Sequence, residues 1–413
     1  MRILHAIHSF PPDSHGGTET YVRELAAAQQ ARGDAVAIVA GSDRVERRDP
    51  LVLEREEGLD VWRLRPPPRG LAQLVGVDEG ARASLEAVIE RTRPQLFHLH
   101  HWHNLTSDAI AVARRRGAAA VVTLHDLWAS CPLFFRLPDH RDLCPTARTV
   151  DECARCVARL VAAPHQALLD RFAQRRERLA EELRLAGIVL ALSLEQRDWL
   201  RELLGPVSER LVAAPLPAPR VASPPPRRER AGSPRRLVVA TWGALDPGKG
   251  LGTLVEAAER LPDPARVAIH HHGRLLDAAE RAAVERAARR VTLTLNGPYT
   301  ASALAEMSAD ADVAVFASRY FETHGLVVDE ALALGLPVLV ADRGAPAARV
   351  GARGRVFRAG DAEQLARLLH DCLDGDLLTS LRQAARPALR SMADHLVELD
   401  RAYAVAAAAA STR

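Results

Sequence analysis

Residues 312–341, DVAVFASRYFETHGLVVDEALALGLPVLVA, hold two short apolar runs with a helical pattern between them. The runs at 312–317 and 337–341 are rich in valine and alanine, which is typical of buried strands. Residues 326–334 have the spacing of a helix that connects them. A strand, a helix and a second strand in this order form a crossover between parallel neighbours. This stretch therefore predicts an α/β fold.

The same alternation runs through most of the 413-residue chain. In the first half, strands are expected at 2–7, 35–40, 95–100, 119–124 and 188–192, and helices at 18–32, 79–92 and 165–186. In the second half, further strands are expected at 236–241, 266–271 and 291–295, and further helices at 250–260, 277–289, 301–309 and 361–374. Continuous apolar strands that alternate with helices are typical of doubly wound parallel sheets covered on both faces.

A proline- and arginine-rich stretch, PLPAPRVASPPPRRERAGSPRR at 215–236, separates these two halves. It has no apolar period, which is the composition of a linker. We expect an N-terminal domain over 1–215 and a C-terminal domain over 216–385, both Rossmann-like and facing a cleft. Ligands of such sheets bind beyond the carboxyl ends of the strands.

The composition excludes several classes of function. The formal net charge is only +3, and 55 basic residues are scattered among 52 acidic ones, so a nucleic-acid partner is not expected. No run of 18 apolar residues could span a membrane. The N-terminus MRILHAIHSF lacks the features of a signal peptide. The sequence thus predicts a cytoplasmic protein and leaves a peripheral membrane contact open.

The chain has a single lysine, Lys249, among its 55 lysine and arginine residues. It lies between Gly248 and Gly250, just before an expected helix. A compact ammonium on a flexible stem can reach a phosphate oxygen where a planar guanidinium does not fit. A Gly-Lys-Gly turn that opens a helix is also a common geometry for anion binding. The alternative is the chance survival of one surface lysine.

Two further candidate positions follow N-terminal strands. In FPPDSHGGTETYVREL (10–25), Gly16 and Gly17 permit a tight turn and a close approach to a ligand, although a plain strand-to-helix turn is equally compatible. His125 ends the strand AAVVTL, where it can donate to a sugar hydroxyl or a phosphate oxygen. The alternative for His125 is a structural hydrogen bond to a local carbonyl.

The segment after the strand at 312–317 carries the most specific pattern, two glutamates separated by seven residues. Glu322 lies in the loop and Glu330 lies about a turn into the helix. The backbone N–H groups of Gly325, Leu326 and Val327 are expected to face a diphosphate at the helix N-terminus. Carboxylates do not bind phosphate, so the two glutamates are expected to bind hydroxyl groups of a ribose and a hexose. A nucleotide sugar carries both.

Five segments, in this order, resemble the retaining GT-B glycosyltransferases of family 4, also called glycosyl transferases group 1. The segments are PPDSHGGTETYVRELA (11–26), TLHDLW (123–128), DPGKGLGTLVEAA (246–258), ETHGLVVDEA (322–331) and ALGLPVLVADRGA (333–345). The resemblance covers nearly the whole chain. It implies a GT-B fold, with residues 386–413 forming a closing helix that returns to the N-terminal domain.

The resemblance also implies an activity. Such enzymes move a sugar from a UDP-, GDP- or ADP-sugar to the hydroxyl of a carbohydrate, lipid-linked or small-molecule acceptor. They form an α-glycosidic bond and require no metal or other cofactor. It implies catalytic roles for Lys249 at the diphosphate and for Glu322 and His125 at the transferred sugar. The donor-binding roles fall to Glu330 at the ribose, to Gly325, Leu326 and Val327 at the phosphates, and to Gly16 and Gly17 at the pocket wall.

One departure from the family pattern keeps other functions open. Ala244 stands where the family usually has an arginine that clamps the phosphates, and Arg319 is a candidate replacement. Two alternatives to sugar transfer are therefore retained. One is a sugar-nucleotide epimerase or hydrolase on the same scaffold, and the other is a noncatalytic relative that binds nucleotide sugars.

A cysteine-rich insertion, residues 127–160, follows His125. Its four thiols have the pattern C-x12-C-x8-C-x2-C, and such spacing is compatible with a structural zinc site. Reduced thiols without metal are the alternative. The candidate ligands are Cys131, Cys144, Cys153 and Cys156. Just upstream, the run FHLHHWHN (97–104) contains His98, His100, His101 and His103. Alternate histidines in a strand face one side, and we expect this strand end to line an acceptor pocket rather than to bind a metal.

Overall fold

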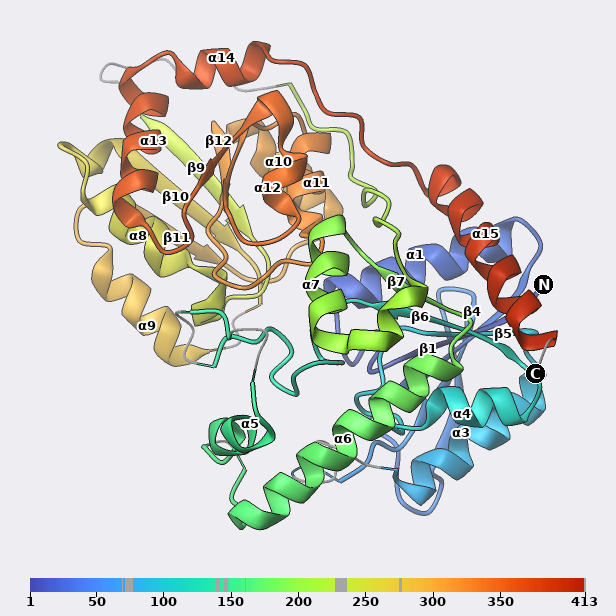
Figure 1. The fold of residues 1–413 in the computed structure, drawn as a ribbon. Helices are drawn as coiled ribbons and strands as arrows, with labels where there is room; N and C mark the ends of the chain where they lie inside the picture. Colours follow the sequence, from blue (N-terminus) through green and yellow to red (C-terminus); the bar gives the residue numbers. More distant parts are fainter. Residues whose placement is uncertain are drawn as a thin grey trace. The chain divides into compact units, whose positions relative to one another are not determined.

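The computed structural model describes residues 1–411 except 69, 71–76, 139–141, 145–147, 160, 227–235 and 275–276. Part of the expected linker, 227–235, therefore lies outside the described residues. The chain forms two compact units (Figure 1). Unit 1 comprises Met1–Phe134, Pro145–Leu216 and Ser391–Arg413, and unit 2 comprises Phe135–Cys144 and Pro217–Arg390.

Unit 1 contains an eight-stranded sheet in the order β3-β4-β2-β1-β5-β6-β7-β8. Its strands are β1 (Arg2–Ile7), β2 (Ala35–Gly41), β3 (Leu51–Glu56), β4 (Leu59–Leu64), β5 (Leu96–Leu99), β6 (Ala119–Leu124), β7 (Ile188–Ala191) and β8 (Leu211–Ala213). All neighbours are parallel except β3 and β4, which form an antiparallel hairpin at the edge. Glu57 and Gly58 both have positive φ in its two-residue turn, as a tight hairpin requires.

Helices cover both faces of this sheet (Figure 1). Helices α1 and α15 lie on one face, and α3, α4 and α6 lie on the other, so the expected doubly wound arrangement is confirmed. The helices of unit 1 are α1 (Gly17–Ala31), α3 (Glu79–Thr92), α4 (Ala109–Arg115), α5 (Val150–Val157), α6 (His165–Leu185), α7 (Leu194–Leu204), the 3-10 helix η1 (Gly205–Arg210) and α15 (Met392–Ser411).

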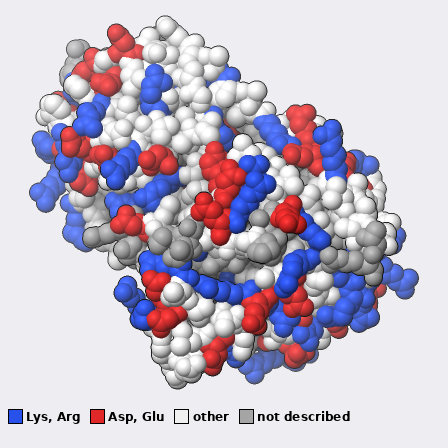
Figure 2. All heavy atoms as spheres, viewed as in Figure 1, with Lys and Arg blue, Asp and Glu red and all other residues white. Residues whose placement is uncertain are grey.

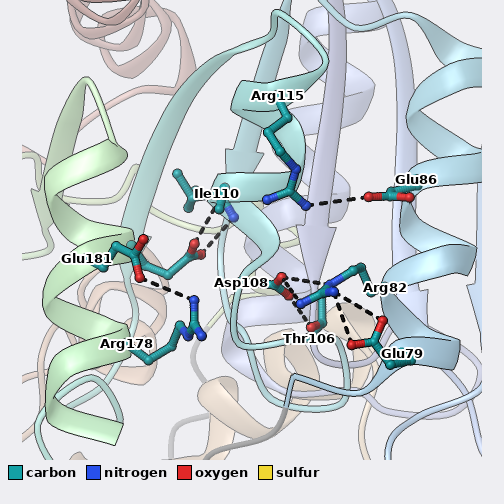
Figure 3. Close-up of polar contacts among 11 residues, drawn as sticks. Glu79, Arg82, Glu86, Thr106, Asp108, Ile110, Arg115, Arg178 and Glu181 are labelled. Carbon is teal, nitrogen blue, oxygen red and sulfur yellow. Dashed lines mark hydrogen bonds and ion pairs between the residues drawn. The ribbon is translucent and has the colours of Figure 1, made fainter. Parts of the chain in front are cut away.

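The short helix α4 depends on a carboxylate from another helix. Its N-cap residue, Asp108, makes no side-chain capping bond. Instead Glu182 of α6 accepts hydrogen bonds from the N–H groups of Ile110 (2.7 Å) and Ala111 (2.9 Å). Figure 3 shows Ile110 in the first turn of α4 and, nearby, the ion pair between Asp108 and Arg82. A cap supplied from about 70 residues away leaves no local sequence signal, so this helix was not predicted.

Unit 2 contains a six-stranded, fully parallel sheet in the order β11-β10-β9-β12-β13-β14. Its strands are β9 (Leu237–Trp242), β10 (Val267–His272), β11 (Thr292–Asn296), β12 (Val313–Phe316), β13 (Val338–Ala341) and β14 (Gly354–Phe357). The chain builds outward from β9 through β10 to β11, and then returns to place β12 on the other side of β9. The carboxyl ends of β9 and β12 therefore flank a topological switch point, the usual ligand position in such sheets.

Two apolar clusters cover the two faces of this sheet. Leu237 and Val239 of β9 pack in one cluster, which includes residues of α8 and α13. Ala240 and Trp242 of the same strand pack in the other, which includes residues of α10 and α11. The helices of unit 2 are η2 (Pro247–Lys249), α8 (Leu251–Glu259), η3 (Pro264–Arg266), α9 (Ala278–Ala287), α10 (Ala301–Asp310), α11 (Leu326–Ala333), α12 (Pro346–Arg349), η4 (Gly351–Arg353), α13 (Ala362–Asp374) and α14 (Leu377–Gln383).

The surface charges are interspersed. On the face shown in Figure 2, basic and acidic side chains alternate over both units. Many arginines form ion pairs with acidic side chains, such as Arg44 with Glu54 and Arg266 with Asp374. Within the described residues, no helix is long and apolar enough to cross a membrane. The expected location and the peripheral membrane contact stay predictions.

Candidate active site

The turn that carries Lys249 follows the end of β9 and is fixed by Asp246. The Asp246 Oδ1 atom accepts a hydrogen bond from the N–H of Gly248 (2.7 Å) and so caps η2. The Tyr320 hydroxyl donates to the same oxygen (2.8 Å). Because Tyr320 follows β12, this bond ties together the loops after the two strands at the switch point.

Lys249 and Glu322 form an ion pair at this point. The Lys249 Nζ atom lies 2.7 Å from Glu322 Oε1, and the side chains are 33% and 20% exposed. Ser318 Oγ donates to the same carboxylate oxygen (2.7 Å). Burial opposes charge on both groups, but their mutual attraction wins: it raises the pKa of Lys249 and, with Ser318, lowers the pKa of Glu322. Both groups are therefore charged at neutral pH.

The backbone of Glu322 is held by the loop that follows β13. The Glu322 carbonyl accepts a hydrogen bond from the N–H of Ala345 (2.9 Å), and Glu322 forms an isolated bridge with Gly344. Gly344 has φ +84, and a Cβ there would lie 2.2 Å from the Glu322 carbonyl oxygen. Only glycine allows this approach, so the loop that follows β13 sets the position of Glu322.

Helix α11 begins at Leu326, four residues after Glu322, and its N-terminus has no side-chain cap. Its N-cap, Gly325, has φ +77 and no side-chain capping bond. Arg349 donates to the carbonyl of His324 (2.6 Å) and to Asp329 Oδ1 (2.7 Å), which anchors the preceding loop to the first turn. The N–H groups of Gly325, Leu326 and Val327 thus lie at the positive end of a helix dipole, where an anion is stabilised.

Glu330, the second acid of the pattern, contacts the end of β9 rather than Lys249. Its Oε2 atom accepts a hydrogen bond from Trp242 Nε1 (2.6 Å). Trp242 is buried and orients one carboxylate oxygen. Unit 2 therefore brings Lys249 and Glu322 together, with the α11 N-terminus and Glu330 on the segment that follows.

An aromatic pair flanks the ion pair. The rings of Phe135 and Tyr320 are stacked with centroids 4.1 Å apart. Lys249 Nζ lies 5.9 Å from the Phe135 centroid and 5.4 Å from the Tyr320 centroid. Phe135 comes from the cysteine-rich insertion. This insertion therefore supplies a side chain to the site around Lys249 and Glu322 in unit 2, which we call the lysine site.

In unit 1, helix α1 begins at Gly17, and Gly16 is its N-cap. The φ of Gly16 is −104, so backbone freedom is not what this position requires. A Cβ on Gly16 would lie 2.6 Å from Glu19 Oε2. Burial disfavours ionised Glu19, but His8, with Nε2 3.4 Å from Glu19 Oε1, holds its pKa at about 2. Gly16 therefore leaves room for a buried carboxylate next to the start of α1.

His125, at the end of β6, is 8% exposed, and its Nε2 lies 3.0 Å from Nδ1 of His100. The expectation that this strand end lines an acceptor pocket is wrong for His98 and His100. Both are buried (0% and 2% exposed), and both nitrogens of His98 are bonded, to Tyr403 and to Thr123. Strand periodicity places them on one face, as expected, but α15 packs against the sheet there.

Because of its buried histidines, we expect the protein to lose stability at acidic pH. Burial lowers the pKa of His5 to about 4 and that of His98 well below its usual 6.5. Unfolding therefore takes up protons below pH 6.5, and the stability from each neutral histidine is lost as the pH falls from 6.5 towards 4. We expect His98→Gln to make the dependence of unfolding free energy on pH shallower by about 1.4 kcal/mol per pH unit in this window.

Denaturant titrations between pH 7 and pH 5 measure this slope. His370→Gln is the matched control, because His370 is an exposed histidine on a surface helix. An unchanged slope in His98→Gln would contradict the prediction.

A zinc site at the four cysteines stays a prediction. Cys131, Cys153 and Cys156 belong to unit 1 and Cys144 to unit 2. Among the described residues, His5, His98 and His100 form a group of potential metal ligands whose ligand atoms lie within 4.8 Å of one another. Elemental analysis of the purified protein is the test.

Several residues of the lysine site were missed by sequence reasoning, namely Asp246, Ser318, Tyr320 and Trp242. Asp246 had a readable signal, since Asp-Pro at the start of a helical turn is a capping pattern. The others become visible only once β9 and β12 are known to be neighbours. Arg319, the candidate replacement for the arginine missing at Ala244, directs Nη2 to Thr253 of α8 (3.2 Å).

Comparison with known proteins identifies the class of enzyme to which the chain belongs. Residues 15–217 match Glycosyltransferase Family 4 and residues 236–375 match Glycosyl transferases group 1. The chain belongs to this family of enzymes. The sequence-based expectations of fold and enzyme class are confirmed.

Solved structures of similar fold cover almost the whole chain. Sucrose-phosphate synthase from Thermosynechococcus elongatus is 19% identical, with a TM-score of 0.66 over 98% of this chain and 99% of that chain. HepE of Anabaena, in complex with UDP and glucose, is 18% identical, with a TM-score of 0.63 over 98% and 99%. At these identities the likeness shows the fold alone.

A curated relative matches a smaller part. Sulfoquinovosyl transferase SQD2 of Arabidopsis thaliana is 32% identical over 149 residues, which are 34% of this chain. The chain spans 28% of the length of that relative.

Proposed function

We propose that this enzyme transfers a sugar from a nucleotide-diphosphate sugar to an acceptor hydroxyl with retention, forming an α-glycosidic bond without a metal. The observation that carries the proposal is the Lys249–Glu322 ion pair beside the α11 N-terminus, at the β9/β12 switch point. A cation and a helix dipole suit a diphosphate, and a carboxylate suits sugar hydroxyls. The complexes of HepE with UDP and glucose and of starch synthase IV with ADP are compatible with such a donor.

Lys249 and the α11 N–H groups would act on the leaving group. Cleavage of the sugar–phosphate bond leaves a nucleoside diphosphate on which negative charge grows. Fixed positive groups that meet this charge stabilise the transition state more than the ground state. They would also take the place of a metal ion as the electrophile at the diphosphate.

Glu322 and Glu330 would hold the two sugars of the donor. Glu322 accepts from hydroxyls of the transferred sugar, and Glu330, oriented by Trp242, accepts from those of the ribose. The Glu322 carboxylate already pairs with Lys249 and Ser318, which favours a binding role over that of a covalent nucleophile. The acceptor hydroxyl then attacks on the face that the phosphate leaves, and a phosphate oxygen takes its proton.

Unit 1 would contribute His125 to the transferred sugar, and Gly16 and Gly17 to the wall of the donor pocket. The base of the nucleotide, the transferred sugar and the acceptor class remain open among UDP-, GDP- and ADP-sugars and among carbohydrate, lipid-linked and small-molecule acceptors. A thermal-shift screen over these donors identifies the base, because a ligand that binds the native state raises the melting temperature.

Incubation with a donor panel, with and without acceptors, tests the reaction itself. Nucleoside diphosphate released only with an acceptor, together with an α-linked product formed in excess EDTA, is the expected result. Release or isomerisation without an acceptor would instead indicate a hydrolase or epimerase. Binding without turnover would indicate the noncatalytic relative that Ala244 left open.

Glu322→Gln tests the role of the first glutamate. The amide keeps one acceptor oxygen but loses the charge, and a charge-assisted hydrogen bond contributes about 2 kcal/mol. We expect kcat/KM for the donor to fall about thirtyfold. The affinity for free nucleoside diphosphate should be kept or rise, because Lys249 no longer pairs with a carboxylate.

Glu256→Gln is the matched control, since Glu256 forms an exposed pair with Arg260 on α8 of the same unit. If Glu322→Gln kept the wild-type kcat/KM, Glu322 would have no role in binding the donor sugar.

A further inference from the structure

A chain of hydrogen-bonded side chains connects α1 to His125 through the buried core of unit 1. Gln29 Oε1 lies 2.7 Å from His5 Nε2, and His5 Nδ1 lies 3.0 Å from His100 Nε2. His100 Nδ1 lies 3.0 Å from His125 Nε2. Gln29 lies in α1 and His5 in β1, and His100 and His125 directly follow β5 and β6. Gln29, His5 and His100 are at most 2% exposed.

The Gln29 amide gives the chain a direction. Its Nε2 donates to the Tyr403 hydroxyl (3.1 Å), which leaves Oε1, an acceptor, against His5. A neutral imidazole has one N–H and one lone pair. His5 must then donate from Nε2 and accept at Nδ1, and His100 must donate to it from Nε2. By the same argument, His100 accepts at Nδ1, so His125 donates to it from Nε2 and carries its own lone pair on Nδ1.

The imidazoles of the chain are neutral. Burial lowers the pKa of His5 to about 4 and that of His125 to about 3, and it lowers the pKa of His100 well below the usual value. A charged ring would carry two N–H groups, and one of them would face a donor. The chain therefore requires neutral rings, each of which donates from one nitrogen and accepts at the other.

A side branch satisfies the same rule. The Tyr403 hydroxyl, which accepts from Gln29, donates to His98 Nδ1 (2.9 Å), and His98 Nε2 donates to Thr123 Oγ1 (2.8 Å). Ligand atoms of His5, His98 and His100 also lie within 4.8 Å of one another. Both nitrogens of His98 are already hydrogen-bonded, so a metal ion at this position would break the branch. The geometry therefore favours a hydrogen-bonded network over a metal site.

We propose that Gln29 is a positioning residue whose amide, acting through His5 and His100, fixes His125 as the Nε2–H tautomer, so that Nδ1 accepts a hydrogen bond from a hydroxyl of the donor sugar. This inference rests on the proposed function, which assigns His125 to that sugar. A lone pair binds a hydroxyl but repels a phosphate oxygen. The chain thereby restricts His125 to the sugar end of the donor.

Nitrogen NMR of the 15N-histidine-labelled full chain reads the tautomer directly, because protonated and unprotonated ring nitrogens differ widely in chemical shift. The His125 signal is assigned by its loss in His125→Gln. In the wild type we expect the Nε2–H pattern. In Gln29→Met, which removes both amide groups at similar volume, we expect a mixture of tautomers. Gln30→Met is the matched control, an exposed glutamine next along the same helix.

Kinetics of the same variants connect the tautomer to the donor. We expect kcat/KM for the nucleotide sugar to fall about tenfold in Gln29→Met, the effect of one misdirected hydrogen bond. The affinity for nucleoside diphosphate alone, measured by thermal shift, should not change. A merely destabilising effect would weaken both ligands together. Tyr403→Phe, which removes the partner of the amide N–H, should act in the same direction.

Three results would overturn the proposal: an Nδ1–H pattern for His125 in the wild type, an unchanged pattern in Gln29→Met, or a changed pattern with unchanged kcat/KM for the donor. A failure of the proposed function would be distinguishable from these results. If the wild type transfers no sugar at all, the NMR comparison still tests whether Gln29 sets the tautomer.

Discussion

Replacing Lys249 by alanine is expected to lower the rate of sugar transfer at least a hundredfold while the protein stays folded. The ammonium is the cation that Glu322 contacts at 2.7 Å, and in the proposed reaction it neutralises the departing diphosphate. A hundredfold loss corresponds to about 2.7 kcal/mol of transition-state stabilisation, within the range for one charged group at a site of developing charge. Steady-state transfer at saturating donor measures it.

Lys249→Arg sharpens this test. The guanidinium keeps the charge but is larger and planar, and the Phe135 and Tyr320 rings lie within 6 Å of the ammonium. We expect it to recover less than about a tenth of the wild-type rate. Arg260→Ala, at the exposed C-terminal end of α8, is the control. Transfer at the wild-type rate in Lys249→Ala would refute the assignment of this site.

Gly250→Ala is expected to produce the largest loss of stability, about 3 kcal/mol or more. Gly250 has φ +76, a conformation that costs an L-residue roughly 1–2 kcal/mol. A Cβ there would also meet the carbonyl oxygen of Ala317, and relief of the overlap requires movement of backbone at the end of β12. Chemical denaturation of the full chain, with donor binding in parallel, measures the effect.

Gly252→Ala is the control for this substitution. Gly252 lies two residues further on, inside α8, and a Cβ there would meet no atom closer than 3.7 Å. Alanine in a helix interior is favoured over glycine by roughly 0.5–1 kcal/mol, so this variant should be as stable as the wild type or more stable. Equal losses from both substitutions would show that the turn at Lys249 is not tightly constrained.

The sequence predicted the parts of the fold that depend on short-range apolar patterns. The strand at 2–7 and the helix at 79–92 have the predicted bounds. The hairpin of β3 and β4 was missed because it is an edge element with alternating exposure, and its LVLERE run reads as half polar. Helix α7 has a serine cap, Ser193, and was overlooked although that signal was present.

The candidate site was predictable to the level of strand ends. Lys249 and Glu322 are 73 residues apart, and their contact follows from the neighbouring positions of β9 and β12. The role of Gln29 was not predictable, because a helix pattern marks it only as a core-facing position. Its partners His5 and Tyr403 come from opposite ends of the chain. Polar networks of this kind depend on tertiary neighbours that no local period encodes.

Residues Phe135–Cys144 belong to unit 2, although the chain on either side of them belongs to unit 1. The two halves are thus not modules that a single cut would separate. A chimera that joins the C-terminal half of this enzyme to the N-terminal half of a relative would leave Tyr320 without Phe135, its own stacking partner. Exchange of donor specificity between relatives should therefore succeed only when this decapeptide travels with the C-terminal half.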